Sequence, residues 1–239
     1  MSIAESGSLT RRERQRAATV EEIKEVARGL MRDHGASEVR FTDIAKEMGM
    51  TPPALYRYYA DRDELLTDLI ADGYRDLGRT VAAARETVDQ DDVAGRWIVV
   101  GKAYRDWARS EPAQFALILG MPLPGYVAPE DGPTTDAAKD AMGQLAQLFL
   151  RAAELGVLSE PLVAEVSDEM LAHFEEKAEL GDAITAATHQ AMLHAWATLH
   201  GMTCLDAYGQ FDWMSEGARD ALFESALRSA ARAAGFPVD

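Results

Sequence analysis

The chain has 239 residues, a mass of 26.1 kDa and a formal net charge of −16, with 47% hydrophobic and 27% charged residues. This length can bury a substantial core, and the composition excludes a wholly disordered or collagen-like chain. The single cysteine, Cys204, excludes an internal disulfide and a cysteine-rich zinc finger. Because no apolar run approaches the ~20 residues of a membrane helix, and residues 1–16 lack the apolar stretch of a secretory signal, we expect a cytoplasmic protein without membrane contact.

Apolar residues recur at helical spacing along most of the chain. In chain order, the stripes begin at Ile23, Leu65, Val93, Ala138 and His189, and each continues in steps of three and four residues. No segment alternates with the period of a strand, and no hairpin turn signal separates two β-branched runs. The pattern therefore predicts an all-α fold.

Charged residues are unevenly distributed along the chain. Residues 1–62 contain eleven Lys/Arg and ten Asp/Glu, whereas residues 63–239 contain thirteen and thirty. Arginines gather near the start at positions 11, 12, 14 and 16, and residues 48–60 contain no acid. A net charge of −16 disfavours attraction of the whole surface to nucleic acid, but one local positive face is enough to contact phosphate.

The first helix has two possible starts. Thr10 with Glu13 and Thr19 with Glu22 both fit the capping-box pattern, so either threonine can begin it. We expect residues 1–18 to form a flexible basic arm, residues 19–66 a helix-turn-helix domain, and residues 67–239 a larger helical domain. Four prolines between Met121 and Thr135 predict a non-helical loop there.

The segment from Phe41 to Arg62, FTDIAKEMGMTPPALYRYYADR, is the most informative. Thr42 is expected to cap a short helix, and Gly49 to supply a tight left-handed turn after it. Thr51 would then cap a second helix that extends to about Tyr59. Leu55 and Tyr58 are expected to face back to the first helix, and the small side chain of Ala45 lets the two helices cross closely. This spacing is typical of a helix-turn-helix.

The outer face of the second helix is suited to DNA. A helix of this size fits the major groove with its first turn toward the base edges. The hydroxyls of Tyr56 and Tyr58 can donate to phosphate oxygens, and Arg62 can pair with another phosphate. The alternative is a plain helical bundle, in which short helices joined by glycine also occur. The candidate DNA-binding residues are Thr42, Thr51, Pro52, Pro53, Ala54, Tyr56, Arg57, Tyr58 and Arg62.

A family resemblance rests on three short runs of residues, Thr42–Gly49, Leu55–Tyr59 and Arg62–Leu66. Together they resemble the N-terminal domain of TetR-type (tetracycline-repressor-like) regulators over about residues 20–70. The resemblance implies phosphate contacts from positions 56, 58 and 62, where Tyr58 and Arg62 replace the commoner histidine and lysine. A shorter run, Ala195–Leu205, resembles the Trp/His-Gly branch of regulatory C-terminal domains.

The resemblance implies that the rest of the chain dimerises and binds a small molecule. Bulky residues of this region supply adaptable apolar surface of the kind that lines ligand pockets. Aromatic and Met residues at helical spacing are, however, more often plain core. The candidate pocket residues are Trp97, Tyr104, Trp107, Phe115, Met142, Phe149, Phe174, Met192, Trp196 and His200. The loop at 121–135 either gates this pocket or is a disordered connector.

The last two helices, expected at roughly 183–209 and 214–235, carry small residues that permit close helix approach. They are candidates for a homodimer interface, and packing within one subunit is the alternative. The five histidines contain no pair at the i,i+4 spacing of a helical zinc site. Glu169, His173 and Glu176 share a face, but we expect no metal and no cofactor.

Three hypotheses for function follow. The first is a ligand-responsive repressor that a small apolar or amphipathic effector releases from a palindromic operator on double-stranded DNA. The second is a DNA-binding regulator without an effector, controlled by its abundance or by a protein partner. The third, a helical enzyme, has little support because no nucleophile–base arrangement, phosphate loop or metal spacing is found.

Overall fold

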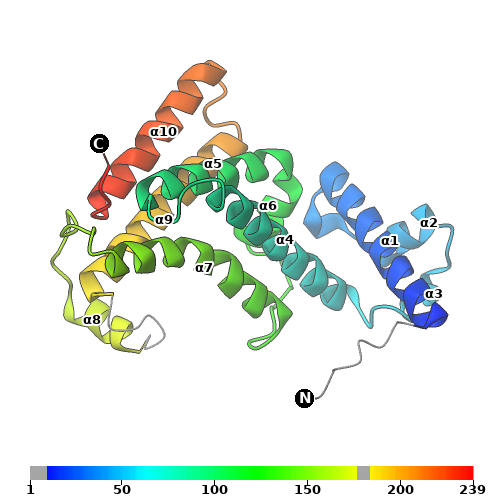
Figure 1. Cartoon of the computed structure of the whole chain (residues 1–239). Coiled ribbons are helices and arrows are strands. Elements are labelled where there is room, and N and C mark those ends of the chain that lie inside the picture. The colour runs from blue at the N-terminus through cyan, green and yellow to red at the C-terminus, as the bar shows by residue number, and fades with distance from the viewer. Residues whose placement is uncertain (1–9, 177–183, 239) are drawn as a thin grey trace. The chain divides into compact units, whose positions relative to one another are not determined.

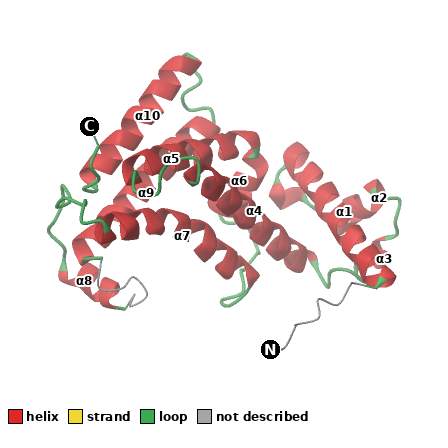
Figure 2. Cartoon of the chain, in the orientation of Figure 1, coloured by secondary structure: helices red, strands yellow, loops and turns green. Residues whose placement is uncertain are grey.

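The computed structural model describes residues 10–176 and 184–238, and every regular element in these ranges is a helix (Figures 1 and 2). The predicted all-α fold is confirmed. The chain folds into two compact units. Unit 1 comprises residues 1–73 and 113–134, and unit 2 comprises residues 74–112 and 135–239. Within the described residues, no helix is both long enough and apolar enough to cross a membrane.

Unit 1 contains the helix-turn-helix and the helices that support it. Its elements are α1 (Arg11–His34), the 3-10 turn η1 (Ala36–Glu38), α2 (Phe41–Glu47), α3 (Pro52–Leu55), the first half of α4 (Arg62–Arg85), and α6 (Pro112–Leu119) from Ala113 onward. Its core is formed by buried apolar side chains of α1, α2, α3 and α4, including Ile23, Ala27, Ile44, Leu55, Leu65 and Leu66. The predicted domain boundary at residue 66 falls inside α4, because this helix continues without a break to Arg85.

The first helix begins at the earlier of its two possible starts. The Thr10 hydroxyl accepts a hydrogen bond from the Glu13 amide, and the Glu13 carboxylate accepts one from the Thr10 amide, at 3.3 and 2.7 Å. This capping box satisfies two helix-end donors. The prediction of a flexible arm is therefore wrong for residues 10–18, which are the cap and first two turns of α1. Residues 1–9 lie outside the described part of the chain.

Unit 2 contains α5 (Val93–Ser110), α7 (Pro133–Glu154), α8 (Asp168–Glu175), α9 (Ala186–Ala207) and α10 (Glu216–Ala233). The second half of α4 also belongs to this unit. The α7 helix begins at Pro133, so the last three residues of the predicted loop at 121–135 are helical; proline at the first helical position loses no intrahelical hydrogen bond. The last two helices occupy the predicted region, although residues 177–183 are outside the described part.

An aromatic cluster fills the centre of unit 2. The rings of Trp97 and Phe149 both pack against Phe236, with centroids 6.3 and 4.6 Å away. The Trp97 indole N–H donates to the Leu227 carbonyl at 2.8 Å, which satisfies its polar atom inside the core. Gly101 lies against the Leu227 side chain, where a Cβ atom would come within 2.6 Å, so α5 and α10 approach closely at this point.

Candidate nucleic-acid interface

The turn between α2 and α3 depends on one glycine. Gly49 has φ = 63°, a conformation that is strained for residues with a Cβ atom. The Met50 amide donates to the Ala45 carbonyl at 2.8 Å, and the Gly49 amide donates to the Lys46 carbonyl at 3.2 Å. These two bonds form a Schellman end for α2 and set the direction in which the chain enters α3. The predicted left-handed turn is confirmed.

The start of α2 differs from the prediction. Arg40, not Thr42, is the N-cap residue, and its backbone is extended. Thr42 therefore lies in the first turn of α2, where its side chain is exposed. The ring of Phe41, the first helical residue, packs against Tyr56 with centroids 5.2 Å apart. This contact joins α2 to the turn after α3, a link that helical periodicity alone does not reveal.

The α3 helix is a single turn that two prolines begin. Thr51 is its N-cap, as predicted, but no hydrogen bond of the Thr51 side chain caps the helix. Pro52 and Pro53 occupy the first two helical positions, where the absent N–H groups have no intrahelical partner in any case. The α-helix ends at Leu55, so the predicted continuous helix to Tyr59 is wrong, and Tyr56, Arg57 and Tyr58 belong to a turn.

Burial separates the side chains of this segment into two groups. Leu55 and Tyr59 are buried, and the Tyr59 hydroxyl donates to Asp68 of α4 at 2.8 Å. Tyr56 is 57% exposed, and Thr51, Pro52, Pro53 and Arg57 are also exposed. The prediction that Tyr58 faces back to the first helix is wrong, because the chain leaves α3 before reaching it. We call residues 51–58 the recognition segment; its exposed side chains form one solvent-facing surface.

Arg62 has a structural role at the start of α4. Its guanidinium donates to the carbonyls of residues 36, 37 and 39 at 2.9–3.1 Å. These bonds fasten the loop between α1 and α2 to the start of α4. Contact between Arg62 and a DNA phosphate stays a prediction.

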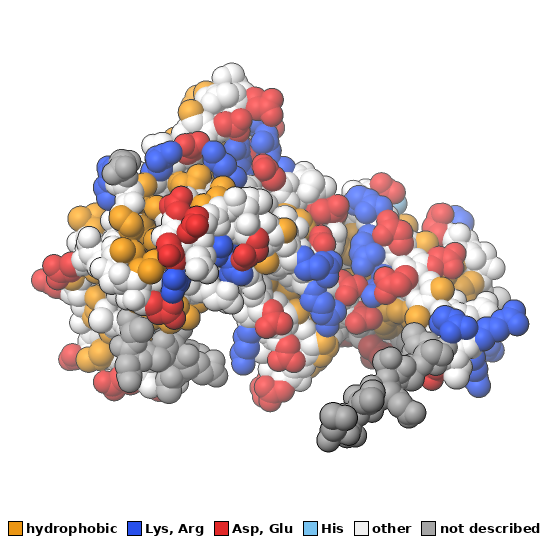
Figure 3. Space-filling model, viewed as in Figure 1, with side chains coloured by type: hydrophobic (Ala, Val, Ile, Leu, Met, Phe, Trp, Pro, Cys, Tyr) orange, Lys and Arg blue, Asp and Glu red, His pale blue; other side chains and the backbone are white. Residues whose placement is uncertain are grey.

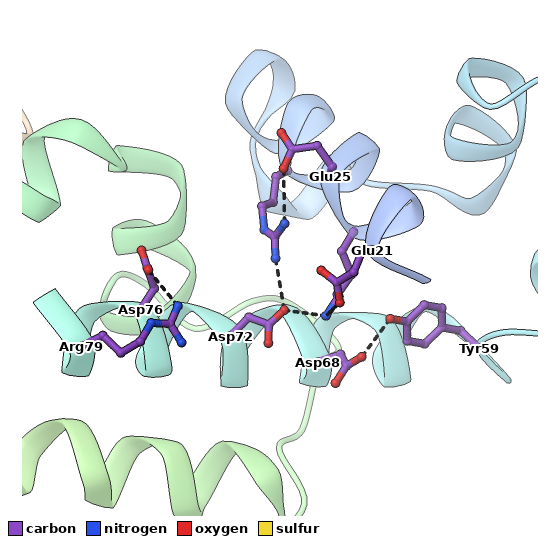
Figure 4. A network of polar contacts seen from close by, with 9 residues as sticks. Glu21, Glu25, Tyr59, Asp68, Asp72, Asp76 and Arg79 are labelled. Carbon is purple, nitrogen blue, oxygen red and sulfur yellow. Dashed lines mark hydrogen bonds and ion pairs between the residues drawn. The ribbon is translucent and has the colours of Figure 1, made fainter. Parts of the chain in front are cut away.

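Ion pairs hold α1 against α4 (Figure 4). Asp72 of α4 accepts from Lys24 at 2.7 Å and from Arg28 at 3.1 Å. Burial would lower the pKa of Lys24, but hydrogen bonds and charge from Asp72 and Glu21 outweigh this effect and raise it. Lys24 is buried, so it remains charged inside the unit only with such partners. The pairs fix α1 on α4 and thereby position the recognition segment.

The cations near the recognition segment have different surroundings. Arg11, Arg12, Lys46 and Arg57 make no ion pair within the described residues. In Figure 3, blue side chains gather at the right-hand edge, where Figure 1 shows the start of α1 beside α3. Solvated cations without acidic partners are available for phosphate oxygens, and the acid-free recognition segment adds no repulsion.

The ten predicted pocket residues do not form one group. Phe115 of α6 is buried in unit 1, whereas the other nine belong to unit 2. Trp97 and Phe149 are core residues of the aromatic cluster, and the Trp107 indole N–H donates to Asp76 at 2.8 Å. These contacts favour the plain-core interpretation for these three residues. Met142 and Met192 are half-buried, and so is Phe174, whose ring packs near His189.

Three of the predicted pocket residues do meet. The Tyr104 hydroxyl and His200 Nδ1 lie 2.9 Å apart, and the Trp196 ring stacks on His200 with centroids 5.6 Å apart. Burial raises the pKa of Tyr104 and lowers the pKa of His200, so both are neutral near pH 7. The Trp196 indole nitrogen is buried and has no hydrogen-bond partner within the described residues. No group of three or more His, Cys, Asp or Glu placed to hold a metal occurs in that part either, so Glu169, His173 and Glu176 are not assembled as a metal site.

A glycine-centred helix-turn-helix with a solvent-facing, acid-free recognition segment, joined to a larger helical unit, defines a DNA-binding transcriptional regulator. Family comparisons agree with this class. A family model described as bacterial regulatory proteins of the tetR family matches residues 17–69, and one described as a tetracyclin repressor-like C-terminal domain matches residues 97–230. The chain belongs to the TetR family.

Individual relatives extend over most of the chain. The HTH-type transcriptional regulator Rv1816 of Mycobacterium tuberculosis and Mb1846 of Mycobacterium bovis are each 34% identical over 191 residues, which is 79% of this chain and 80% of theirs. The crystal structure of SCO4313, described as a regulatory protein, is 33% identical, covers 92% of this chain and 98% of its own, and superposes with a TM-score of 0.72. The FadR regulator of Bacillus halodurans shares the fold at 14% identity and a TM-score of 0.60, over 89% of this chain and 94% of its own.

Proposed function

We propose that this protein is a repressor that binds a palindromic operator as a homodimer and that a small apolar or amphipathic effector releases it. The observation that carries the DNA-binding part is the recognition segment, in which Thr51, Pro52, Pro53, Tyr56 and Arg57 are exposed. The segment contains no acid, and the cations beside it make no ion pair within the described residues. Because a repressor acts on the chromosome, the proposal includes a cytoplasmic location. It also includes a role other than catalysis.

Direct readout is assigned to the recognition segment. Thr51, Pro52, Pro53 and Ala54 lie at the start of α3, where a helix meets base edges in the major groove. Arg57 follows in the turn and can reach a guanine edge or a phosphate, while Tyr56 and Tyr58 carry hydroxyl donors. Thr42 and Arg62 flank this surface from α2 and α4.

The experiment for DNA binding begins with selection of bound fragments from the host genome. A shared palindrome is the expected result. On that operator, Arg57→Ala is expected to lower affinity about tenfold or more without changing the melting temperature, because the Arg57 side chain is exposed. Arg79→Ala, an exposed charge change on α4, is the matched control. Unchanged affinity for Arg57→Ala would overturn the assignment.

Dimerisation is assigned to α9 and α10. Apolar residues surround α9 on all sides, yet Leu193, Ala197 and Leu205 are exposed in the isolated chain. On α10, the exposed small or apolar residues include Ala218, Ala221, Leu222, Ser225 and Ser229. A helix that is apolar all round is normally covered on every side. A second copy placed by two-fold symmetry would cover this face and set two recognition segments one DNA turn apart.

The dimer proposal is tested with Ala221→Arg, since a charge placed on an apolar interface is expected to separate the subunits. Sedimentation should then show a monomer with a native circular dichroism spectrum and greatly weakened operator binding. Asp220→Arg alters a neighbouring position that pairs with Arg105, so Lys139→Glu, at an exposed position of α7 outside the proposed interface, is the cleaner control. A variant that stays dimeric contradicts the interface.

The effector part rests on the contacts of Tyr104, Trp196 and His200. Their stacked rings and the Trp196 indole nitrogen, which has no partner within the described residues, supply apolar faces with a polar donor. This combination holds small amphipathic molecules. An effector that prefers one helix arrangement would weaken DNA binding through a coupling of about 1–3 kcal/mol.

A thermal-shift screen with a library of apolar and amphipathic compounds tests this part. A stabilising compound is expected to release the operator in a mobility-shift assay, and His200→Ala should reduce its effect. If no compound stabilises the protein, control by abundance or by a protein partner becomes the favoured function.

A further inference from the structure

A basic groove lies beside the recognition segment. It has a volume of about 600 Å³ and is lined by Arg11, Arg12, Gln15, Arg16, Arg57 and Tyr58. We propose that this groove binds the sugar–phosphate backbone of DNA outside the base pairs that α3 reads. This inference rests on the proposed function. It would lengthen the footprint of each subunit without adding base specificity.

The N-terminal extension of α1 builds one wall of the groove. Residues 11–16 precede the part of the chain that matches the family model, which begins at residue 17. The Thr10–Glu13 capping box makes these residues helical, and hydrogen bonds from Thr10 lower the pKa of Glu13. The Glu13 carboxylate is thus engaged by the helix cap, and Arg11 and Arg12 have no ion pair within the described residues.

Arg16 connects this wall to the opposite one. Its guanidinium donates to the Arg57 carbonyl at 3.2 Å and lies over the Tyr58 ring, 5.4 Å from the centroid. Neither contact neutralises its positive charge. Arg16 therefore acts as a positioning residue that keeps α1 beside the turn after α3, and the groove between them keeps its shape.

The lining chemistry favours a phosphodiester chain. Among the described residues, six line the groove; four of them are arginines and none is acidic, while Gln15 and Tyr58 add neutral donors. Guanidinium groups bind phosphate oxygens through paired N–H donors. Because Arg57 and Tyr58 belong both to the groove and to the recognition segment, a duplex docked on α3 would continue directly into the groove. Its bases would face α3, and its backbone would face the arginines.

The experiment compares Arg11→Gln/Arg12→Gln with the wild-type protein on an operator carrying long flanks. We expect affinity at low salt to fall by about tenfold or more, and the slope of log affinity against log salt to fall by about 1 for each arginine lost per bound subunit. The loss should be the same on operator and unrelated DNA. Removing the flanks should weaken the wild-type protein and leave the double variant unchanged.

Two further variants isolate the groove. Arg32→Gln/Lys139→Gln removes the same net charge from exposed positions outside the groove and is expected to keep the wild-type salt slope. Arg11→Lys/Arg12→Lys retains the charge and should restore most of the slope. All variants should keep the wild-type melting temperature, since residues 11 and 12 are exposed.

The outcomes separate this inference from the proposed function. A protein that selects no palindrome contradicts the proposed function. A protein that binds its palindrome, but whose salt slope is equal for wild type and Arg11→Gln/Arg12→Gln, overturns the groove alone. An equal loss in the groove variant and in Arg32→Gln/Lys139→Gln would also overturn it, because the effect would then come from overall charge.

Discussion

Cations at the recognition surface and cations in unit 2 have opposite surroundings. In unit 2, Arg105 lies 2.7 Å from Asp206, and Lys102 lies 2.8 Å from Glu224. Beside the recognition segment, Arg11 and Arg57 have no acidic partner within the described residues. The same residue type therefore stabilises the fold where it is paired and remains available to phosphate where it is not, which explains how a chain of net charge −16 can contact DNA.

The stabilising role of the paired cations in unit 2 is tested most strongly at Asp206. Its side chain is almost fully buried and lies near Arg105, Arg109 and Arg219, at 2.7, 3.4 and 4.0 Å. Asp206→Ala leaves Arg105 buried with a half-exposed partner, so we expect the free energy of unfolding to fall by about 3–5 kcal/mol. Urea unfolding followed by tryptophan fluorescence measures the change. Asp212→Ala removes an exposed partner of Arg219 and should have little effect. Equal losses would contradict the role of burial.

The same residue gives a pH dependence. Burial would raise the pKa of Asp206, but the Arg105 hydrogen bond and three nearby positive charges outweigh it, and the pKa is lowered. The unfolded chain then binds this proton more readily than the folded one. The stabilisation is present above the unfolded pKa of about 3.9 and is lost as the pH falls through the folded pKa. The stability gap between wild type and Asp206→Asn should therefore be constant near pH 7 and narrow below about pH 4; a gap independent of pH would disprove this.

The role of the cations without acidic partners is tested by placing an acid on the recognition segment. Pro53→Glu adds a carboxylate at an exposed position in the first turn of α3, where the helix dipole tolerates it. We expect operator affinity to fall at least tenfold through repulsion of phosphate, while stability changes by less than about 1 kcal/mol. Pro53→Gln is the control, because it removes the proline without adding a charge. If both variants bind alike in a mobility-shift assay, charge at this position is unimportant.

The smallest effect is expected at a paired cation on the surface. Arg228 lies 3.0 Å from Glu224, which precedes it by one helical turn; the Arg228 side chain is exposed and the Glu224 side chain is partly exposed. Such pairs contribute about 0.3–0.5 kcal/mol. Arg228→Gln should change the free energy of unfolding by no more than this. A loss above about 1 kcal/mol would show that exposed pairs in this chain carry more stability than the comparison assumes.

Periodicity predicted the parts of the fold that depend on local sequence. The helical stripes, the turn at Gly49 and the prolines at the start of α3 lie where expected. The end of α3 was not predictable, because no breaker residue follows Leu55. Once the helix ends there, helical spacing no longer applies, and Tyr59 rather than Tyr58 reaches Asp68.

Contacts between distant residues could not be predicted from one sequence. The bond from Arg16 to the Arg57 carbonyl spans 41 positions, and the pair of Arg105 with Asp206 spans 101. The arginines near the start were visible as a cluster, but their placement beside the recognition segment needed the structure. The pocket residues show the same limit, since spacing alone did not separate core aromatics such as Trp97 from the group around His200.

Two adjacent prolines at the start of α3 also bear on the thermodynamics of recognition. Each ring restricts φ, so residues 52 and 53 enter the complex with little backbone freedom left to lose. Neither can donate an amide hydrogen to a phosphate, so this end of α3 relies on side chains. Association with DNA should consequently carry only a small entropic penalty from this turn. Calorimetry should therefore show a more favourable binding entropy for the natural protein than for the Pro52→Ala/Pro53→Ala variant.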